Sequence, residues 1–549
     1  MKNNLIVVLS GEIGAGKSTL ATNLAQNFGF KILKTRDALR FYSKHFKKQS
    51  HEDERMFLQR VGEQMDKRTN GLWVVEFFQK CILENDKTIL DSLRIQEQIE
   101  SFRQSFGYQN VIHVYLNASE RTLEIRHFER NQLPLDDLQS IQEYKLYKSN
   151  PTEHKVKELI KDADLVIDTD RLSPHDNTIR VASFLRLLPK IHNELVDVII
   201  GGQFGSEGKG QISAYLSPEY DCLVRVGGPN AGHKVYEFPE PMTFHLLPSG
   251  VRRAPNAKII IGPGAVLSLK VILEEINKFG IMPDRLYIDE LATIISEKDI
   301  KEEAKLDKIG STKQGVGAAT ANNLFLYRLT EDKQHKAKNC PQLKQYITSA
   351  HIEYEKLYAS NKRILLEGTQ GSMLSLHHGI YPYVTSRDTS VSGCISEAGI
   401  SPRRIRKIIM VTRTYPIRVQ SPKDGTSGPF SRMGDNIELT LEDISKRSRI
   451  PLEDIQSIEI TSTTKRQRRI AEFNWGIFRE SCELNSPTDI ALTFTDYLDI
   501  ENRKARRYDQ LSKATTKFID EVERCSGVPV SLIATHFNHR AIIDRRNWI

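Results

Sequence analysis

The sequence predicts an α/β fold with two domains, each built around a parallel sheet. The apolar runs Leu5–Leu9 and Val196–Ile200 each lead into a glycine-rich loop that is followed by a helical pattern. Between them, strand-like runs alternate with helical patterns in a βαβ rhythm. The chain has 549 residues, which is too long for a single hydrophobic core. We therefore expect one domain at residues 1–190 and another at residues 195–549.

The composition is typical of a globular protein without a membrane span. Hydrophobic residues make up 39% of the chain and charged residues 27%, and no apolar run approaches the ~18 residues that a spanning helix needs. The apolar run near the N-terminus is short and leads into a glycine loop, so it predicts a first strand rather than a signal peptide. We therefore expect a cytoplasmic protein with no membrane partner.

Charge and cysteine usage argue against two further classes of site. The net charge of +8 is modest for this length, so small anionic ligands account for it and no nucleic-acid partner is expected. The six cysteines lack CxxC spacing, which argues against a zinc site and a disulfide framework and fits a reducing cytosol.

The first domain is predicted from short apolar runs that end in polar residues. Leu5–Leu9 precedes a loop and a helix that starts at Lys17, and a polar stretch from Ser183 to Glu194 joins this domain to the next strand. The further strands expected here are Thr88–Leu90, Val111–Leu116 and Asp164–Ile167. Parallel strands connected by helices in this way have helices on both faces of the sheet.

The loop after the first strand fits the phosphate-binding pattern GxxxxGK[ST] in full. It reads GEIGAGKS and lies between a strand and a helix, which is the context that a P-loop needs. Backbone N–H groups cradle the phosphates in such a loop, the lysine reaches the β- and γ-phosphates, and the serine helps to hold Mg²⁺. The residues with these predicted roles are Gly11, Gly14, Gly16, Lys17, Ser18 and Thr19.

Further polar residues follow the other strands of this domain. The element Asp91-Ser-Leu-Arg94 and a run of arginines after Val111–Leu116 resemble those of nucleoside-monophosphate kinases and dephospho-coenzyme A kinases. Phosphoryl transfer needs converging positive charge, although a surface salt bridge explains any one of these arginines equally well. The resemblance implies acceptor or lid roles for Arg36, Asp37, Asp91, Arg94, Arg126 and Arg130.

A second phosphate loop opens the second domain. Gly201–Gln211 reads GGQFGSEGKGQ, and its glycines let the backbone approach a phosphate that Lys209 can neutralise. It is followed by Val226–His233, which reads VGGPNAGH. Together the two motifs resemble the adenylosuccinate synthetase family. The resemblance continues in order through FHLLPSG at 244–250, IGSTKQGVG at 309–317, EGTQG at 367–371, HGIYPYVTS at 378–386 and TTKRQRR at 463–469.

The resemblance implies a ligase that joins L-aspartate to C6 of a purine nucleotide. In this family a nucleoside triphosphate first phosphorylates the 6-oxygen, an aspartate base removes the N1 proton, a histidine donates a proton or hydrogen bond, and Mg²⁺ neutralises the phosphates. ATP and GTP both remain open as donors here, because Phe494 replaces a lysine of the family's base-recognition motif.

The roles carried over residue by residue fall into five groups. His233, Ser206 and Lys209 occupy the catalytic positions, and Gly232 the magnesium position. The substrate nucleotide would contact Asn230, Thr312, Gln370, Thr385, Arg418 and, from a neighbouring subunit, Arg328, which implies a homodimer. Aspartate would contact Thr464, Arg466 and Arg468, and the triphosphate Gly205, Glu207, Gly208, Gly210 and Asp496.

The second phosphate loop departs from the family pattern at one position. Ser206 stands where the family has its catalytic aspartate, and serine cannot act as a carboxylate base. The smaller neutral residue leaves room for a 2-amino group and an oxygen to accept from it. With serine in place of aspartate, the loop also resembles that of phage 2-aminoadenylosuccinate synthetases, which act on dGMP. We expect dGMP as substrate, with Glu207 or the substrate itself taking the N1 proton.

Two alternatives stay open. The chain would be an ordinary adenylosuccinate synthetase if IMP or dIMP is its substrate. It would be a catalytically dead nucleotide sensor if Ser206 marks lost turnover, and a sensor would bind nucleotides without consuming aspartate.

For the first domain, a deoxynucleoside monophosphate and the succinylated product are both open as kinase acceptors.

Overall fold

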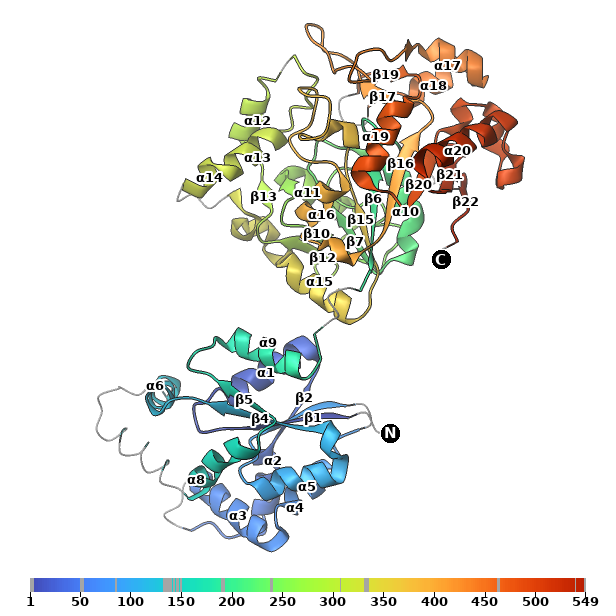
Figure 1. Ribbon diagram of the computed structural model, residues 1–549. Helices are drawn as coiled ribbons and strands as arrows, with labels where there is room; N and C mark the ends of the chain where they lie inside the picture. Colours follow the sequence, from blue (N-terminus) through green and yellow to red (C-terminus); the bar gives the residue numbers. More distant parts are fainter. Residues whose placement is uncertain are drawn as a thin grey trace. The chain divides into compact units, whose positions relative to one another are not determined.

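The computed structural model describes most of the chain in two compact units, Met1–Leu188 and Pro189–Ile549. They are called the N-terminal and C-terminal units below, and each is described by itself (Figure 1). The described residues are 4–49, 54–83, 86–131, 141, 144, 148, 151–188, 193–236, 240–306, 308–329, 335–461, 465–538 and 540–547.

The N-terminal unit is a parallel sheet between two layers of helices. Its strand order is β2-β3-β1-β4-β5, and every strand pair in it is parallel. The strands are β1 (Leu5–Ser10), β2 (Lys31–Lys34), β3 (Lys87–Asp91), β4 (Val111–Asn117) and β5 (Leu165–Asp168). The helices are α1 (Lys17–Phe28), α2 (Thr35–Ser43), α3 (Glu54–Thr69), α4 (Leu72–Phe78), α5 (Gln96–Phe106), α6 (Glu120–Asn131), α8 (Pro151–Glu158) and α9 (Pro174–Phe184).

The alternation of side chains along β1 separates the two cores of this unit. Ile6 and Val8 pack with residues of α2, α4, α5 and α8, whereas Val7 and Leu9 pack with residues of α1, α6 and α9. Successive strand residues point to opposite faces, so an unbroken apolar run is what a strand covered on both faces requires.

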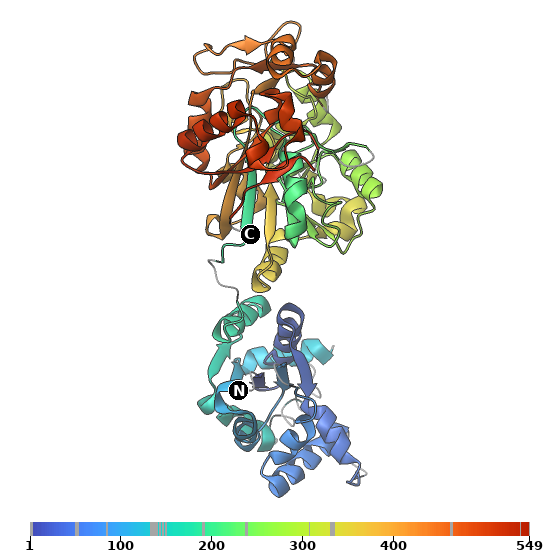
Figure 2. The same cartoon turned by 90° about the vertical axis from the view of Figure 1, so that its right-hand side faces the viewer.

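The C-terminal unit is built on a longer sheet. In its described part the strand order is β14-β12-β10-β7-β15-β6-β16-β20-β21-β22, and all neighbours are parallel except β21 and β22. In that order the strands are Ile347–Thr348, Leu286–Asp289, Lys258–Ile261, Cys222–Arg225, Ile364–Glu367, Val196–Gly201, Ile405–Arg413, Asp489–Thr493, Val530–Ala534 and Ile542–Asp544. Helices lie on both sides of this sheet (Figures 1 and 2).

Shorter strands and the helices complete this unit. The strands outside the large sheet are β8 (His233–Val235), β9 (Met242–Phe244), β11 (Val266–Leu267), β13 (Thr293–Ile294), β17 (Ile417–Val419), β18 (Glu438–Leu439) and β19 (Arg468–Ala471). The helices are α10 (Lys209–Leu216), α11 (Leu269–Phe279), α12 (Glu297–Glu303), α13 (Val316–Leu324), α14 (Leu326–Leu329), α15 (Ala350–Ala359), α16 (Val391–Ala398), α17 (Leu441–Ser448), α18 (Leu452–Ile458), α19 (Trp475–Asn485) and α20 (Lys513–Ser526).

The predicted α/β class with parallel sheets is confirmed in both units. The edge strand β2, Lys31–Lys34, was not anticipated, because a four-residue strand with a lysine at each end shows no apolar run. The six cysteines form no disulfide. None of the described helices combines the length and apolar character that crossing a membrane would require.

Candidate active sites

A buried carboxylate within the loop between β6 and α10 holds the loop's backbone by hydrogen bonds. Glu207 is fully buried, and it accepts hydrogen bonds from the backbone N–H of Gln203 at 3.1 Å and of Gly205 at 2.8 Å. Lys209 Nζ donates to the same carboxylate at 2.6 Å. Ser206, in contrast, is exposed and has a positive φ of 55°. The loop thus turns Ser206 outward and Glu207 inward.

Gly210 lets this loop and its helix approach the predicted catalytic histidine. A Cβ atom at Gly210 would lie 2.9 Å from His233 Cβ and 3.0 Å from Ser249 Oγ. Those separations are too short for a side chain, so only glycine permits α10 to pack this closely against β8.

The carboxyl ends of the parallel strands surround a cavity of about 330 Å³. Its wall is strongly cationic, and Glu303 is the one acidic side chain among the described residues that line it. Glu303 itself accepts from Ser311 Oγ and Gly317 N. The predicted site residues in the wall are Gly205, Ser206, Gly208, Lys209, Gly210, Asn230, Gly232, His233, Thr312, Gln370, Thr385, Arg418, Arg466 and Arg468.

Two amides in this wall have unused hydrogen-bonding atoms. Asn230 Oδ1 and Gln370 Oε1 are buried and have no hydrogen-bond partner among the described residues. Gln370 Nε2 donates to Thr385 Oγ1 at 2.8 Å, which fixes the direction of the amide. A buried polar atom without a partner is costly, so these oxygens are suited to a ligand that brings hydrogen-bond donors.

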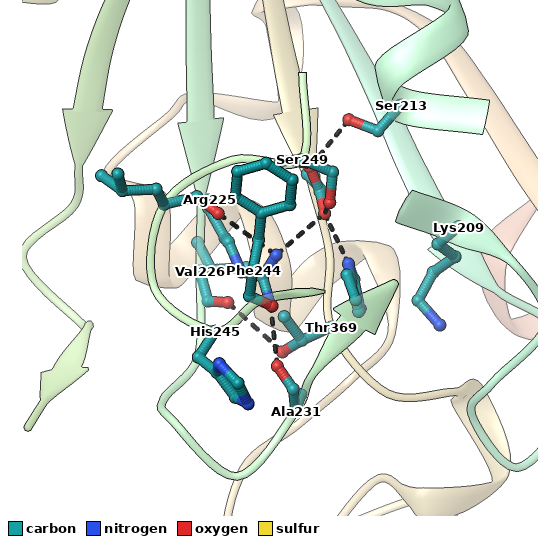
Figure 3. Close-up of polar contacts among 12 residues, drawn as sticks. Lys209, Ser213, Arg225, Val226, Ala231, Phe244, His245, Ser249 and Thr369 are labelled. Atoms are coloured by element: carbon teal, nitrogen blue, oxygen red, sulfur yellow. Dashed lines mark hydrogen bonds and ion pairs between the residues drawn. The ribbon is translucent and has the colours of Figure 1, made fainter. Parts of the chain in front are cut away.

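A buried carboxylate at the end of β15 orients His233. Glu367 Oε1 lies 2.5 Å from His233 Nδ1 and 3.1 Å from Arg225 Nη1. Ser249 Oγ donates to Oε1 at 2.5 Å, and Ser213 Oγ donates to Oε2 at 2.7 Å. Figure 3 shows Ser213, Ser249 and Arg225 directed toward this centre. With Nδ1 held, Nε2 of His233 is the ring nitrogen left to act in the cavity.

The charges of this cluster follow from its burial. Burial, together with the nearby guanidinium of Arg225, lowers the pKa of His233, so the free imidazole is neutral. Burial alone would raise the pKa of Glu367, but Arg225 and the hydrogen bond with His233 outweigh it and keep this pKa well below its usual range. The pair is therefore a carboxylate and a neutral imidazole.

Aromatic rings form the part of the wall beside the phosphate loop. Phe494, Phe537 and Tyr236 all line the cavity, and the first two rings stack with centroids 6.1 Å apart and planes 17° from parallel. A Cβ atom at Gly208 would lie 3.8 Å from the Phe494 ring. Flat apolar faces next to a phosphate loop are suited to a nucleotide base.

Some predicted residues lie away from this cavity. Glu207 and Asp496 are buried outside its lining, and Asp496 Oδ2 accepts from Arg503 Nε at 3.0 Å. Arg328 is exposed on α14 and also lies outside the lining. Thr464 falls outside the described residues.

Sequence reasoning assigned no role to Glu367, Arg225, Tyr236 or Phe537. The first two could have been found, because each is a charged residue that ends an apolar strand, in ILLE and CLVR. The two aromatic residues carried no comparable signal, since they lie about 300 positions apart in the chain.

The N-terminal unit has a separate cavity of about 1780 Å³. Lys17 Nζ lies over the phosphate loop and donates to the carbonyls of Gly11 at 2.7 Å and Glu12 at 2.8 Å. Arg126 donates to Thr169 Oγ1 at 2.9 Å and to its carbonyl at 2.8 Å. The predicted residues that line the cavity are Gly14, Gly16, Lys17, Ser18, Thr19, Arg36, Asp91, Arg94 and Arg126.

Three further predicted residues of this unit lie differently. Gly11 is behind the loop, where a Cβ would lie only 2.3 Å from the carbonyl oxygen of Leu116. Asp37 is exposed in the first turn of α2 and does not line the cavity. Arg130 belongs to α6, but its side chain falls outside the description.

Neither unit offers a ready-made metal cage in its described residues, which contain no group of three or more His, Cys, Asp or Glu side chains able to hold an ion. Ser206 and Gly232 could supply oxygens in the C-terminal cavity, and Ser18 in the N-terminal one. Mg²⁺ bound there would take most of its ligands from nucleotide phosphates and water, as it commonly does.

Comparisons with known proteins connect the C-terminal cavity with a known activity. The family model for adenylosuccinate synthetase matches residues 198–325 and 320–503. The adenylosuccinate synthetase of Methanocaldococcus jannaschii is 34% identical over 359 residues, which cover 64% of this chain and 96% of that protein. That of Pyrococcus horikoshii is 34% identical over 362 residues, or 64% and 99% of the two chains. The chain belongs to the adenylosuccinate synthetase family.

Solved structures of adenylosuccinate synthetases and their relatives have the same fold. The fully ligated adenylosuccinate synthetase from Plasmodium falciparum matches with a TM-score of 0.55 at 23% identity, over 64% of this chain and 100% of that one. The cyanophage S-2L succinoaminodeoxyadenylate synthetase (PurZ), bound to dGMP and to dATP as an energy donor, matches with a TM-score of 0.54 at 25% identity, over 65% and 96%. The chain is thus an adenylosuccinate synthetase-like ligase that joins aspartate to a purine nucleotide.

Proposed function

We propose that the C-terminal unit joins L-aspartate to C6 of dGMP and forms N6-succino-2-amino-dAMP. The observation that carries this proposal is the exposed Ser206 in the wall of the cavity, at the position of the family's catalytic aspartate. A neutral hydroxyl can accept a hydrogen bond from an exocyclic 2-amino group. Hypoxanthine lacks that group, so a site with serine here favours guanine over hypoxanthine.

The similarity to the cyanophage protein supports the same substrate. That protein was solved with dGMP and dATP, and it matches over 65% of this chain at 25% identity. The loop sequence GSEGKG adds to this support, because its serine before the buried glutamate is the feature in which it resembles the phage enzymes.

The contacts of Glu207 bear on the fate of the N1 proton. Glu207 is paired with Lys209 and two backbone N–H groups and lies outside the cavity lining. It is therefore poorly placed to serve as the base, and we favour loss of the N1 proton assisted by the substrates. The reaction stays balanced, because the donor's γ-phosphoryl group moves to the 6-oxygen and leaves as phosphate when the aspartate amine attacks C6.

His233 has the geometry of the acid in this sequence. Glu367 holds its Nδ1, and the lowered pKa keeps the ring neutral until anionic phosphates enter the cavity. A proton gained at Nε2 could then stabilise the negative charge that develops on the 6-oxygen and on the transferred phosphoryl group.

We further propose that the donor is a purine triphosphate whose base lies against the aromatic wall. Phe494 and Phe537 offer stacking faces beside Gly208, whereas Asp496 lies outside the cavity lining, where its Oδ2 accepts from Arg503. Stacking tolerates any purine, so both ATP and GTP should serve. Mg²⁺ bound in this cavity would be held by Gly232 and would neutralise charge on the donor phosphates.

For the N-terminal unit we propose nucleoside-monophosphate kinase activity. Its support is the phosphate loop of Lys17, Ser18 and Thr19 in one cavity with Arg36 and Arg94. Such a site would transfer the γ-phosphoryl group of a triphosphate to a monophosphate and leave two diphosphates. A deoxynucleoside monophosphate and the succinylated product are the two candidate acceptors.

We also propose that the protein works as a homodimer with shared sites. Arg328 is exposed on α14, outside the cavity lining of its own chain. Its neighbours Leu324, Phe325 and Leu329 are 67%, 67% and 74% exposed, and clustered exposed apolar residues favour burial against a partner. A second copy could thus bring Arg328 to the substrate phosphate.

The test is a product assay with the full chain. L-Aspartate, Mg²⁺, ATP and GTP are mixed with dGMP, GMP, dIMP or IMP in separate reactions, and succinylated nucleotides are detected by mass spectrometry. We expect product from dGMP. Product from IMP or dIMP but not from dGMP would overturn the proposed substrate, and nucleotide binding without any product would identify a sensor instead.

A further inference from the structure

A second buried carboxylate, outside the cavity lining, joins two parts of its wall. Glu459 follows the end of α18 and is fully buried. It accepts hydrogen bonds from Arg413 Nη2 at 2.5 Å, Tyr497 Oη at 2.8 Å and Arg468 Nη1 at 3.2 Å. Three side chains from separate parts of the sequence therefore depend on one carboxylate for their position.

Arg468 is the first of the two wall elements. Its backbone N–H donates to the carbonyl of Glu459 at 2.9 Å, and its Nη1 also donates to the carbonyl of Ile458 at 3.3 Å. The side chain lines the cavity with Arg466. Its Nε is buried without a hydrogen-bond partner among the described residues, so the guanidinium is fixed on one side and retains a donor for another acceptor.

Phe494 is the second wall element, and it is held through Arg413. The guanidinium of Arg413 is fully buried and lies 3.9 Å from the centroid of the Phe494 ring. Tyr497, which donates to Glu459, also packs edge-on against Phe494 with centroids 5.3 Å apart. The orientation of this ring, which lines the cavity beside the phosphate loop, thus rests on contacts that meet at Glu459.

The charge balance of the cluster favours an anionic ligand. Burial would raise the pKa of Glu459, but Arg413 and Arg468 outweigh it and lower this pKa, so the carboxylate is ionised. One carboxylate then faces two guanidinium groups, which leaves positive charge at the cavity end of the cluster. A dicarboxylate that binds at Arg468 would compensate it.

We propose that Glu459 is a positioning residue for two of the three substrates, since it orients Arg468 toward the carboxylate of aspartate and, through Arg413, the Phe494 face toward the donor's base. This inference rests on the proposed function of the C-terminal cavity. Within the described part of the chain, the monophosphate residues Asn230, Gln370 and Thr385 form no hydrogen bond with this cluster, so Glu459→Gln should leave monophosphate binding unaffected.

The test is Glu459→Gln in the full chain, with KM measured separately for aspartate, the triphosphate and the monophosphate. Glutamine keeps the shape and removes the charge. We expect the KM for aspartate to rise about tenfold or more and that for the triphosphate several-fold, because hydrogen bonds to a charged group are lost. The KM for the monophosphate should stay within about twofold.

The matched control is Asp197→Asn. Asp197 is also fully buried, accepts from Tyr220 Oη at 2.5 Å and from Arg406 Nε at 2.9 Å, and does not line the cavity. This variant should lose thermal stability without a change in any KM. If Glu459→Gln does not fold, Tyr497→Phe removes one of the three hydrogen bonds and should raise the same two KM values to a smaller extent.

An equal rise of all three KM values, or none, would overturn the proposal. Calorimetric binding of aspartate in the presence of triphosphate provides a readout without turnover. If the wild-type chain turns over no nucleotide, the proposed function fails. The positioning role then stands only if Glu459→Gln weakens aspartate and triphosphate binding but not monophosphate binding, and it fails otherwise.

Discussion

Glu367 and Glu207 are both buried glutamates, but their hydrogen-bond partners give them different roles. Both are buried, but Glu367 accepts from His233 and so sets the chemistry of a side chain that lines the cavity. Glu207 accepts from Lys209 and the loop backbone, so it sets the shape of the loop instead. At the scale of single residues, partners rather than residue type assign the role.

The lowered pKa of His233 predicts a linkage between nucleotide binding and protons. Burial and Arg225 keep the free imidazole neutral, whereas bound phosphates add negative charge that raises its pKa in the complex. The complex then holds a proton that the free protein lacks. Nucleotide affinity should therefore weaken as the pH rises from the His233 pKa of the free protein through the higher His233 pKa of the complex. Calorimetry in buffers of different ionisation enthalpy should show proton uptake on binding.

Two variants control this measurement. His233→Asn should abolish the proton uptake and lower kcat by about 10²- to 10⁴-fold, the range for a general acid. His351→Asn, at an exposed position outside the cavity lining, should leave both unchanged. Uptake that persists in His233→Asn would show that another group takes the proton.

At the scale of elements, the carboxyl ends of β6, β7, β15, β16 and β20 bring distant loops together. The phosphate loop follows β6, Gln370 follows β15 and Phe494 follows β20. Residues from 204 to 537 meet in one cavity because parallel strands end at a common edge. In this arrangement α10 packs closely on β8 at Gly210, where a side chain would not fit.

The change Gly210→Ala tests that packing. The new Cβ would lie 2.9 Å from His233 Cβ, and because α10 and β8 would have to separate, we expect a loss of about 1–3 kcal/mol in stability. The displaced histidine should also lower kcat. Unfolding by urea and steady-state kinetics measure the two effects.

Gly476→Ala is the matched helical control. A Cβ there would meet only Asn474 Oδ1 at 3.3 Å, so this change should leave kcat unchanged. Equal behaviour of the two alanine variants would mean that the close approach at Gly210 is unimportant.

The sequence predicted the elements better than the directions of side chains. Motif spacing identified both phosphate loops and nine further wall residues from segments far apart, including Asn230, Gln370 and Arg418. It could not show that Asp496 is turned away, because that depends on Arg503. It also gave no sign of the Phe537 and Tyr236 wall, since ring contacts depend on which strands and loops lie side by side.

At the scale of the whole molecule, the chain divides into two compact units, each with its own cavity. We therefore predict that the two proposed activities can be lost separately. Lys17→Met should abolish monophosphate phosphorylation and leave succinylation unchanged, and His233→Asn should do the reverse. Parallel assays of the phosphorylated acceptor nucleotide and of the succinylated product measure the two activities. Loss of both activities in either variant would contradict independent sites.

Shared sites in a homodimer make a further prediction. Arg328→Ala and His233→Asn should each be inactive alone, because each removes one part of every site. In a mixture that exchanges subunits, half of the sites in each hybrid dimer are intact, so succinylation should return to about a quarter of the wild-type rate. A mixture that stays inactive although hybrids form would show that Arg328 acts elsewhere.

The central claim is that Ser206 selects the purine, and Ser206→Asp tests it most directly. The measurement is the ratio of kcat/KM for dGMP to that for dIMP, in the wild-type chain and in the variant. We predict that the wild-type ratio is above one and that the substitution lowers it by about 100-fold or more. The carboxylate restores a base for hypoxanthine, and the 2-amino group of dGMP loses the space and the hydroxyl acceptor that Ser206 provides. A ratio that is unchanged by the substitution would contradict the claim.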